Sequence, residues 1–195
     1  ELKKYGVFSK IEIEEISSEL GCVGIAGIGS DAWVAQHLGL TKSGWLPGSA
    51  AVRIEADRWL LLGGALASEL PEQAETEWWG LEIVAGLPHM SEVHQGEYIP
   101  QMLNLQALGG ISFTKGCYMG QETVARAKYR GANNRGLFIL TGCSSQQTLP
   151  GAQLEQQVGD QWKRSGQVLD CWQQGEALLL SAVLPLDSSL EGLWR

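Results

Sequence analysis

The stretch Gly166-Gln-Val-Leu-Asp-Cys-Trp172, with the stretch Ala177-Leu-Leu-Leu-Ser-Ala-Val-Leu184 that follows it, decides the fold of the C-terminal third. Both are short runs rich in apolar residues, and the four residues between them are polar or glycine. Residues 137–140 and 153–158 form two earlier short runs. Runs of this length separated by polar turns are typical of antiparallel strands. The pattern predicts a small antiparallel barrel or sandwich over residues 135–195.

The first third of the chain alternates strand and helix patterns. Strands are predicted around residues 7–13, 20–28, 51–56 and 58–62 from their apolar alternation. Between the second and third strands, Ser30 is a plausible N-cap with Asp31 in the first turn, and Gly39 marks the end of a helix. A second short helix is predicted around residues 65–70. The resulting β-β-α-β-β-α order indicates a ferredoxin-like α+β unit over residues 1–74.

The middle of the chain, residues 75–134, is organised differently. Between Glu69 and Glu97 there are seven glutamates and no lysine or arginine. A helix is predicted over residues 75–85, with Trp78, Leu81 and Ala85 on one face. An irregular segment rich in proline and glycine follows this helix.

Composition excludes several classes of protein. The 195 residues carry 22 acidic and 14 basic side chains, a net charge of −8, which argues against a protein that grips nucleic acid over its whole surface. No run approaches the roughly 18 apolar residues that a membrane helix needs, so we expect no membrane association. The four cysteines are far apart without a close pair, and the three histidines form no ligand pattern, so no metal site is expected. Free thiols in a reducing cytoplasm are the favoured interpretation.

One basic island interrupts this acidic chain. From Lys115 to Arg135 there are five basic side chains and a single acidic one, Glu122. Cys117 stands just before a predicted helix start near Gly120, and both a helix N-terminus and a nearby lysine favour the reactive thiolate form of cysteine. Flanking glycines let the backbone approach a ligand closely. Arg126 and Arg130 are four residues apart, so they share a helix face that could hold an anion.

A purely structural interpretation of the same residues stays open. A cysteine between glycines is often a small packed residue, and a basic helix is often a solvated face. Trp78 and Trp79 pose the same choice, because large aromatic side chains more often pack in cores than line ligand pockets.

The motif Lys115-Gly-Cys-Tyr-Met-Gly-Gln-Glu122 resembles the K-G-C-Y-x-G-Q-E signature of the YgfZ family of folate-binding, tRNA-modifying proteins. The motif residues that carry the match are Lys115, Gly116, Cys117, Tyr118, Gly120, Gln121 and Glu122. Residues 1–10, 98–101, 104–113 and 124–133 extend the resemblance over most of the chain. That family is related to the T-protein, the aminomethyltransferase of the glycine cleavage system.

The resemblance implies a T-protein-like architecture around a central folate site, with a C-terminal β-barrel. It also implies that the N-terminal portion of the first domain is missing here, and that residues 75–134 complete that folate-binding domain. The stretch from Trp78 to Gly86 resembles a W-x-x-x-x-I-x-A-G pattern, which assigns a folate-contacting tryptophan to Trp78. Cys117 becomes the thiol on which the family depends, with its chemical task left open between nucleophile, redox thiol and transient cluster ligand.

These observations lead to three alternative functions, which we rank. The first is a cytoplasmic tetrahydrofolate-binding accessory protein that supports iron–sulfur enzymes, including those that thiolate tRNA. In it Trp78 contacts the pterin, Cys117 is the reactive thiol, and Arg126 or Arg130 holds an anion. The second is a true folate-dependent aminomethyl transferase, so whether the chain is an enzyme stays open. The third, ranked last, is direct tRNA binding through the basic island.

Overall fold

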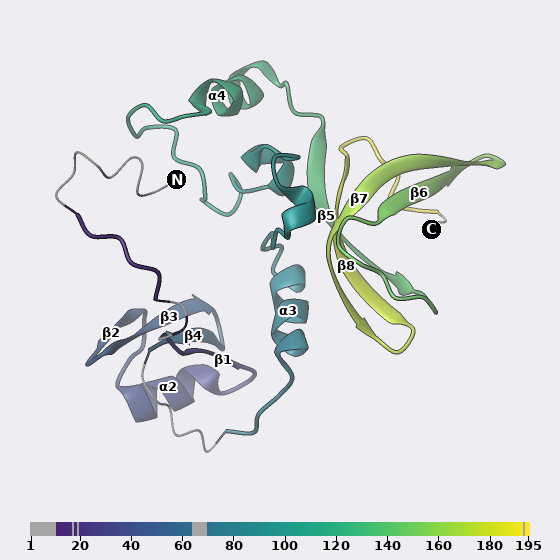
Figure 1. Cartoon of the computed structure of the whole chain (residues 1–195). Coiled ribbons are helices and arrows are strands. Elements are labelled where there is room, and N and C mark those ends of the chain that lie inside the picture. Colours follow the sequence, from purple (N-terminus) through teal and green to yellow (C-terminus); the bar gives the residue numbers. More distant parts are fainter. Residues whose placement is uncertain (1–10, 17, 19, 64–69, 193) are drawn as a thin grey trace. The chain divides into compact units, whose positions relative to one another are not determined.

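The computed structural model describes residues 11–16, 18, 20–63, 70–192 and 194–195. The chain divides into two compact units, one up to Glu72 and one from Gln73 to Arg195, and each contains its own four-stranded sheet (Figure 1). The predicted strand at 7–13 and the predicted helix at 65–70 lie largely outside the described residues, and residues 11–13 form no regular structure. Two antiparallel sheets with few helices make this an α+β fold.

The first unit is built on a split β-α-β arrangement. Its sheet has the order β1-β4-β3-β2 with every neighbouring pair antiparallel, so β1 and β3 run parallel with β4 between them. This is the strand arrangement of one half of a ferredoxin-like unit. The short edge strand β2 was not predicted. The elements are β1 (Cys22–Ala26), α2 (Ser30–Leu38), β2 (Gly44–Leu46), β3 (Ser49–Glu55) and β4 (Arg58–Leu62).

Helix α2 ends where the sequence predicts and is capped differently at its start. Gly39 adopts the left-handed conformation with φ 68°, and its N–H donates to the Ala35 carbonyl at 3.1 Å. The prediction of Ser30 as N-cap was wrong: Gly29 is the N-cap, with φ 94°, and Ser30 is the first helical residue. The Ser30 hydroxyl donates to the Gly27 carbonyl at 2.7 Å, so it braces the preceding turn.

The core of the first unit lies between α2 and the sheet. Its buried members come from β1, α2, β3 and β4: Ile25, Val34, Ala51, Trp59 and Leu61. Trp59 and Val34 are fully buried, so the helix packs directly over the central strand β4.

The second unit contains all four strands predicted for the C-terminal third. They pair antiparallel in the order β5-β8-β7-β6, and β7 is long and visibly curved (Figure 1). Two register shifts in β7 account for the curvature, since bulges bend a strand and increase its twist. The elements are α3 (Glu75–Val84), η1 (Glu92–His94), η2 (Pro100–Leu103), α4 (Gln121–Arg130), β5 (Arg135–Cys143), β6 (Gln153–Val158), β7 (Gln161–Gln174) and β8 (Ala177–Pro185).

Both faces of this second sheet are apolar. One face carries the cluster of Leu154, Val168, Leu180, Ala182 and Leu184. The other carries Leu137, Leu169 and Val183, which pack with Leu103 of η2 and are flanked by Tyr98, Met102 and Leu105. The segment around η2 therefore covers this face of the sheet.

Helix α3 packs on β7 through a face other than the predicted one. Its buried residues are Gly80 and Ile83, whereas Leu81 is 39% exposed. A Cβ added at Gly80 would stand 3.3 Å from the Trp172 ring of β7. The indole of Trp172 lies against the helix where no side chain projects, and this contact sets which face is buried.

Candidate functional site

The motif residues form an exposed loop that leads into α4. Residues 111–120 have no regular secondary structure, and Gly120 adopts φ 87° immediately before the helix begins at Gln121. A side chain is strained in that conformation, which explains the glycine at this position. Cys117 is an exposed, unpaired cysteine in this loop. The predicted placement of Cys117 just before a helix is confirmed, and its thiol is accessible to solvent.

Basic side chains around the motif lie over aromatic rings. The Lys115 ammonium is 4.7 Å from the centre of the Tyr118 ring, and the Lys128 ammonium is 3.6 Å from that of Phe113. Lys128 is also 5.2 Å from the Tyr129 ring, which is 71% exposed. Cation–π contacts of this kind hold flexible lysines close to the surface.

The remaining motif residues and the two arginines lie on the same exposed segment. Gly116 has open space around it, Glu122 is exposed and Gln121 is half-buried. Arg126 and Arg130 are both exposed on α4. The predicted helix face with two arginines is therefore present and open to solvent.

Helix α4 is held in place by a buried glutamine that the sequence interpretation did not single out. The Gln101 side-chain Nε2 donates to the Val124 carbonyl at 2.7 Å, and Gln101 is only 5% exposed. Its Oε1 atom is buried without a hydrogen-bond partner in the described part of the chain. A buried acceptor without a donor is costly to the stability of the fold. Gln101 belongs to a segment that carries the family resemblance, which was the available signal.

Trp78 lies on another element than Cys117. Trp78 is half-buried on α3, which packs on β7 and β8, whereas Cys117 precedes α4, which packs on η2. Trp79, the residue after Trp78, lies against His89, with ring centres 4.5 Å apart. The residues predicted for one folate site are thus supplied by separate elements of the second unit.

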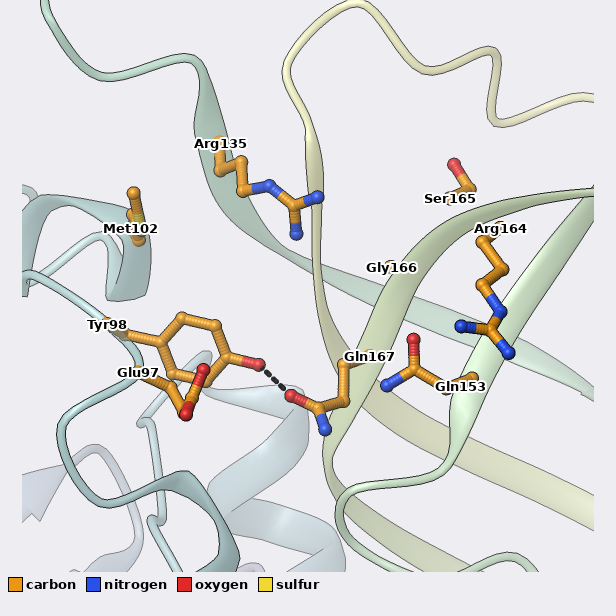
Figure 2. A pocket seen from close by; sticks show the side chains of 9 residues that line it. All are labelled: Glu97, Tyr98, Met102, Arg135, Gln153, Arg164, Ser165, Gly166 and Gln167. Atoms are coloured by element: carbon orange, nitrogen blue, oxygen red, sulfur yellow. Dashed lines mark hydrogen bonds between the residues drawn. The ribbon is translucent and has the colours of Figure 1, made fainter.

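Two cavities open on the second unit, and neither is lined by Trp78, Cys117, Arg126 or Arg130. The first has a volume of about 330 Å³ and lies between the η2 segment and strands β5 to β7 (Figure 2). The second, of about 570 Å³, has polar and aromatic walls that include Trp79, His89, Asp170, Cys171 and Trp172.

The second cavity holds a buried carboxylate and a half-buried thiol. Asp170 is 9% exposed, its Oδ2 lies 3.3 Å from the His89 Nδ1, and its Oδ1 accepts from the Cys171 N–H at 2.8 Å. Burial, followed by the nearby Asp170 charge, raises the pKa of the Cys171 thiol. That thiol donates to the Thr148 carbonyl at 3.0 Å, so Cys171 acts as a packed protonated cysteine.

Two further properties of the described residues bear on function. No three His, Cys, Asp or Glu side chains within the described ranges gather in a way that could hold a metal ion. No described helix is both long enough and apolar enough to cross a membrane.

Comparisons with known protein families and with individual proteins agree with each other. Residues 133–195 match the family described as the β-barrel domain of YgfZ. Three relatives are each named tRNA-modifying protein YgfZ. The protein from Photobacterium profundum is 41% identical over 205 residues, covering 96% of this chain and 60% of the relative.

The other two relatives agree closely. The protein from Vibrio atlanticus is 40% identical, with 89% of this chain and 56% of the relative covered. The protein from Cronobacter sakazakii is 39% identical, with 98% of this chain and 62% of the relative covered. The chain spans about three fifths of the length of these curated relatives. With four strands where residues 133–195 match the barrel domain, and about 40% identity across both units, the chain belongs to the YgfZ family.

Proposed function

We propose that this protein acts in tRNA modification, as a tetrahydrofolate-binding accessory protein of the cytoplasm that supports iron–sulfur enzymes, including tRNA-thiolating ones. The observation that carries the proposal is the identity of about 40%, over most of the chain, to three relatives named tRNA-modifying proteins. A T-protein-like arrangement of the complete protein is part of the same proposal.

Cys117 is the reactive group in this proposal. Its loop is exposed and held next to α4, so a partner protein or a small thiol can reach the sulfur without unfolding the chain. Iron–sulfur clusters normally take four protein ligands. Any cluster contact of Cys117 is therefore shared with a partner enzyme.

The folate part of the proposal rests on Gln101 and Trp78. The unpartnered Oε1 of Gln101 is an acceptor suited to the N–H groups of a pterin, and it lies beneath α4. Trp78 is half-buried, and stacking of its indole on a pterin would contribute about 0.5–1.5 kcal/mol beyond the area buried. The exposed guanidinium groups of Arg126 and Arg130 suit the carboxylates of the folate glutamate.

The test of the tRNA role uses a bacterial strain that lacks its own relative. The protein and its Cys117→Ser variant are expressed in that strain, and thiolated nucleosides of total tRNA are quantified by mass spectrometry. We expect the unmodified protein to restore thiolation and Cys117→Ser to leave it at the level of the empty strain. Cys143→Ser, which changes another exposed cysteine, is the matched control and should restore thiolation. Equal restoration by Cys117→Ser would remove the thiol from the proposal.

The folate part is tested separately by equilibrium dialysis with tetrahydrofolate under reducing, oxygen-free conditions. We expect saturable binding that weakens about ten-fold, or roughly 1.4 kcal/mol, in Trp78→Ala and in Gln101→Leu. Trp45→Ala, at an 89% exposed tryptophan of the first unit, should bind as the unmodified protein does. Cys117→Ser should also bind normally. The absence of saturable binding would overturn the folate part and leave the tRNA part standing.

Direct tRNA contact is a second candidate, favoured by the exposed surface of α4. Arg126, Lys128 and Arg130 are all exposed there, and the exposed Tyr129 ring lies among them. Aromatic rings among cations suit unpaired bases and phosphates. Binding of tRNA that weakens steeply with added salt and is lost in Arg126→Gln with Arg130→Gln would support this candidate.

A further inference from the structure

The cavity of about 330 Å³ in the second unit contains two arginines with no acidic partner. It is lined by Arg135 from the start of β5 and by Arg164 from β7, and also by Tyr98 and Gln167, which are joined by a hydrogen bond (Figure 2). Across the described residues, neither guanidinium group takes part in an ion pair or a hydrogen bond. Glu97 also lines the cavity and is not paired with either arginine.

Three other arginines of the described chain do form ion pairs with carboxylates. Arg53 pairs with Asp31, Arg58 with Glu55, and Arg195 with Glu155. Glu155 is the residue that pairs across the sheet from Arg164, so it would be the natural partner of that arginine. Because Glu155 is paired with Arg195 at 2.8 Å, the Arg164 guanidinium is left without a carboxylate partner among the described residues.

A bulge in β7 positions Arg164 at the cavity. Leu154 and Glu155, adjacent in β6, pair with Gly166 and Arg164, so Ser165 is an extra residue in β7. Bulges redirect side chains and are common beside functional sites. A Cβ added at Gly166 would come within 2.3 Å of a Leu184 side-chain carbon and 2.5 Å of the Val183 carbonyl oxygen. Glycine is therefore required at the back of the cavity.

Polar groups at the floor of the cavity are already fixed by hydrogen bonds. The Tyr98 hydroxyl donates to the Gln167 Oε1 at 2.5 Å, and the Gln167 Nε2 donates to the Gly151 carbonyl at 3.0 Å. Burial is the main cause of the raised pKa of Tyr98, so its hydroxyl stays protonated and continues to donate at neutral pH. The backbone of Arg135 is held as well, because its N–H donates to, and its carbonyl accepts from, the Asn133 side chain.

We infer that this cavity binds the phosphate group of a small phosphate ester. Two unpaired guanidinium groups supply positive charge and forks of N–H donors that match phosphate oxygens. The polar residues Ser165 and Gln153 also line the cavity. A volume of about 330 Å³ is at the lower end of small-molecule sites, which suits a ligand no larger than a mononucleotide. This inference does not depend on the proposed function.

Phosphate is favoured over carboxylate because the cavity presents cations from two different strands. A phosphate monoester has three non-bridging oxygens and carries close to two negative charges at neutral pH, which matches the two positive charges that the arginines bring to the cavity. A single carboxylate has two oxygens and one charge, which one arginine satisfies.

The test is isothermal titration calorimetry at constant ionic strength, with inorganic phosphate, adenosine 5′-monophosphate and acetate as separate probes. We expect one-site binding of the two phosphates with dissociation constants in the millimolar range or tighter. Arg135→Gln and Arg164→Gln should each weaken this binding at least about ten-fold. Acetate, which carries a single carboxylate, should bind at least about ten-fold more weakly than inorganic phosphate.

Lys163→Gln is the matched control, because Lys163 is the exposed residue next to Arg164 and does not line the cavity. It should bind phosphate as the unmodified protein does, and circular dichroism establishes that each variant is folded. A folded protein with no saturable phosphate binding, or equal weakening in Lys163→Gln, would overturn the inference. A short single-stranded oligoribonucleotide without terminal phosphates is the last probe. Tighter binding of this probe than of adenosine monophosphate, lost in the same arginine variants, would overturn the assignment to a small ligand.

Discussion

Two groups of residues, one in each unit of the protein, use arginine in opposite ways. In the first unit, Arg53 donates to both carboxylate oxygens of Asp31, and the Trp59 indole N–H donates to the same carboxylate at 2.7 Å. In the second unit, Arg135 and Arg164 line a cavity and have no carboxylate partner within the described residues. In the first arrangement Arg53 and Trp59 both bond to Asp31, and we call these three residues the closed cluster. In the second, Arg135 and Arg164 are available to a ligand, and we call them the open arginines and their site the open cavity.

This difference separates structural charge from charge available for binding. Asp31 links helix α2 to strands β3 and β4 through its two partners, so its charge is used to hold the unit together. Asp57 completes this corner by accepting from the backbone N–H groups of Gly29 and Asp31. Substitutions in the closed cluster should therefore change stability, whereas substitutions of the open arginines should change ligand binding.

The largest effect is expected from removing Trp59, which joins the closed cluster to the core. Trp59 is fully buried, so Trp59→Ala should cost about 3–5 kcal/mol of unfolding free energy through lost packing and a cavity. Hydrogen exchange measured by mass spectrometry should show faster exchange in peptides of the first unit, with β5–β8 unchanged. Trp45→Ala, at an exposed position in the same unit, should change stability by less than about 0.5 kcal/mol. Equal loss of protection in both units would show that the contacts of Trp59 do not stabilise the first unit alone.

An intermediate effect is expected at the open cavity if its back wall is changed. Gly166→Ala places a Cβ against Leu184 and the Val183 carbonyl, and overpacking of this kind costs about 1–3 kcal/mol. Urea denaturation followed by circular dichroism measures the loss. Gly142→Ala in β5 is the control, because a Cβ there meets nothing within 4 Å. If Gly166→Ala were as stable as the unmodified protein, the backbone at the bulge would be free to shift and the cavity would not be preformed.

Local patterns were enough to predict most strands of both units. The strands at 58–62 and 153–158 have the predicted bounds, and Gly39 ends its helix as predicted, because alternation and left-handed caps are local signals. Strand β2 was missed because it has only three residues, too few for a period. The buried face of α3 was predicted wrongly because Trp172, far away in the sequence, decides it.

The candidate site was predictable in part for the same reason. The exposed Cys117 before α4 follows from the motif and the glycine that starts the helix, both of which are local. The cavity of Arg135 and Arg164 was not predicted, because these residues are brought together by the pairing of β5 with β8 and of β8 with β7. Nor could the sequence show that Glu155 is bound to Arg195. Which arginines lack a partner is a property of the tertiary structure.

The smallest effect we predict is the acid sensitivity of the closed cluster, because its ion pair is partly exposed and screened by salt. The hydrogen bond from Arg53, followed by that from Trp59, holds the pKa of Asp31 well below its ordinary value of 3.8. A carboxyl group with a lowered folded-state pKa stabilises the fold above its unfolded-state pKa, and this contribution is lost as the pH falls toward the folded-state value. The first unit of the unmodified protein should therefore lose stability as the pH is lowered below 3.8, and Asp31→Asn should remove this part of the pH dependence while lowering stability at neutral pH.

Hydrogen exchange of α2 and β4 peptides across an acid pH series measures both effects, after correction for the intrinsic exchange rate at each pH. Arg135→Gln, which removes a charge from the open cavity, should leave the acid profile of the first unit unchanged, and a parallel change in both variants would mean that net charge, rather than the Asp31 contact, sets the acid response.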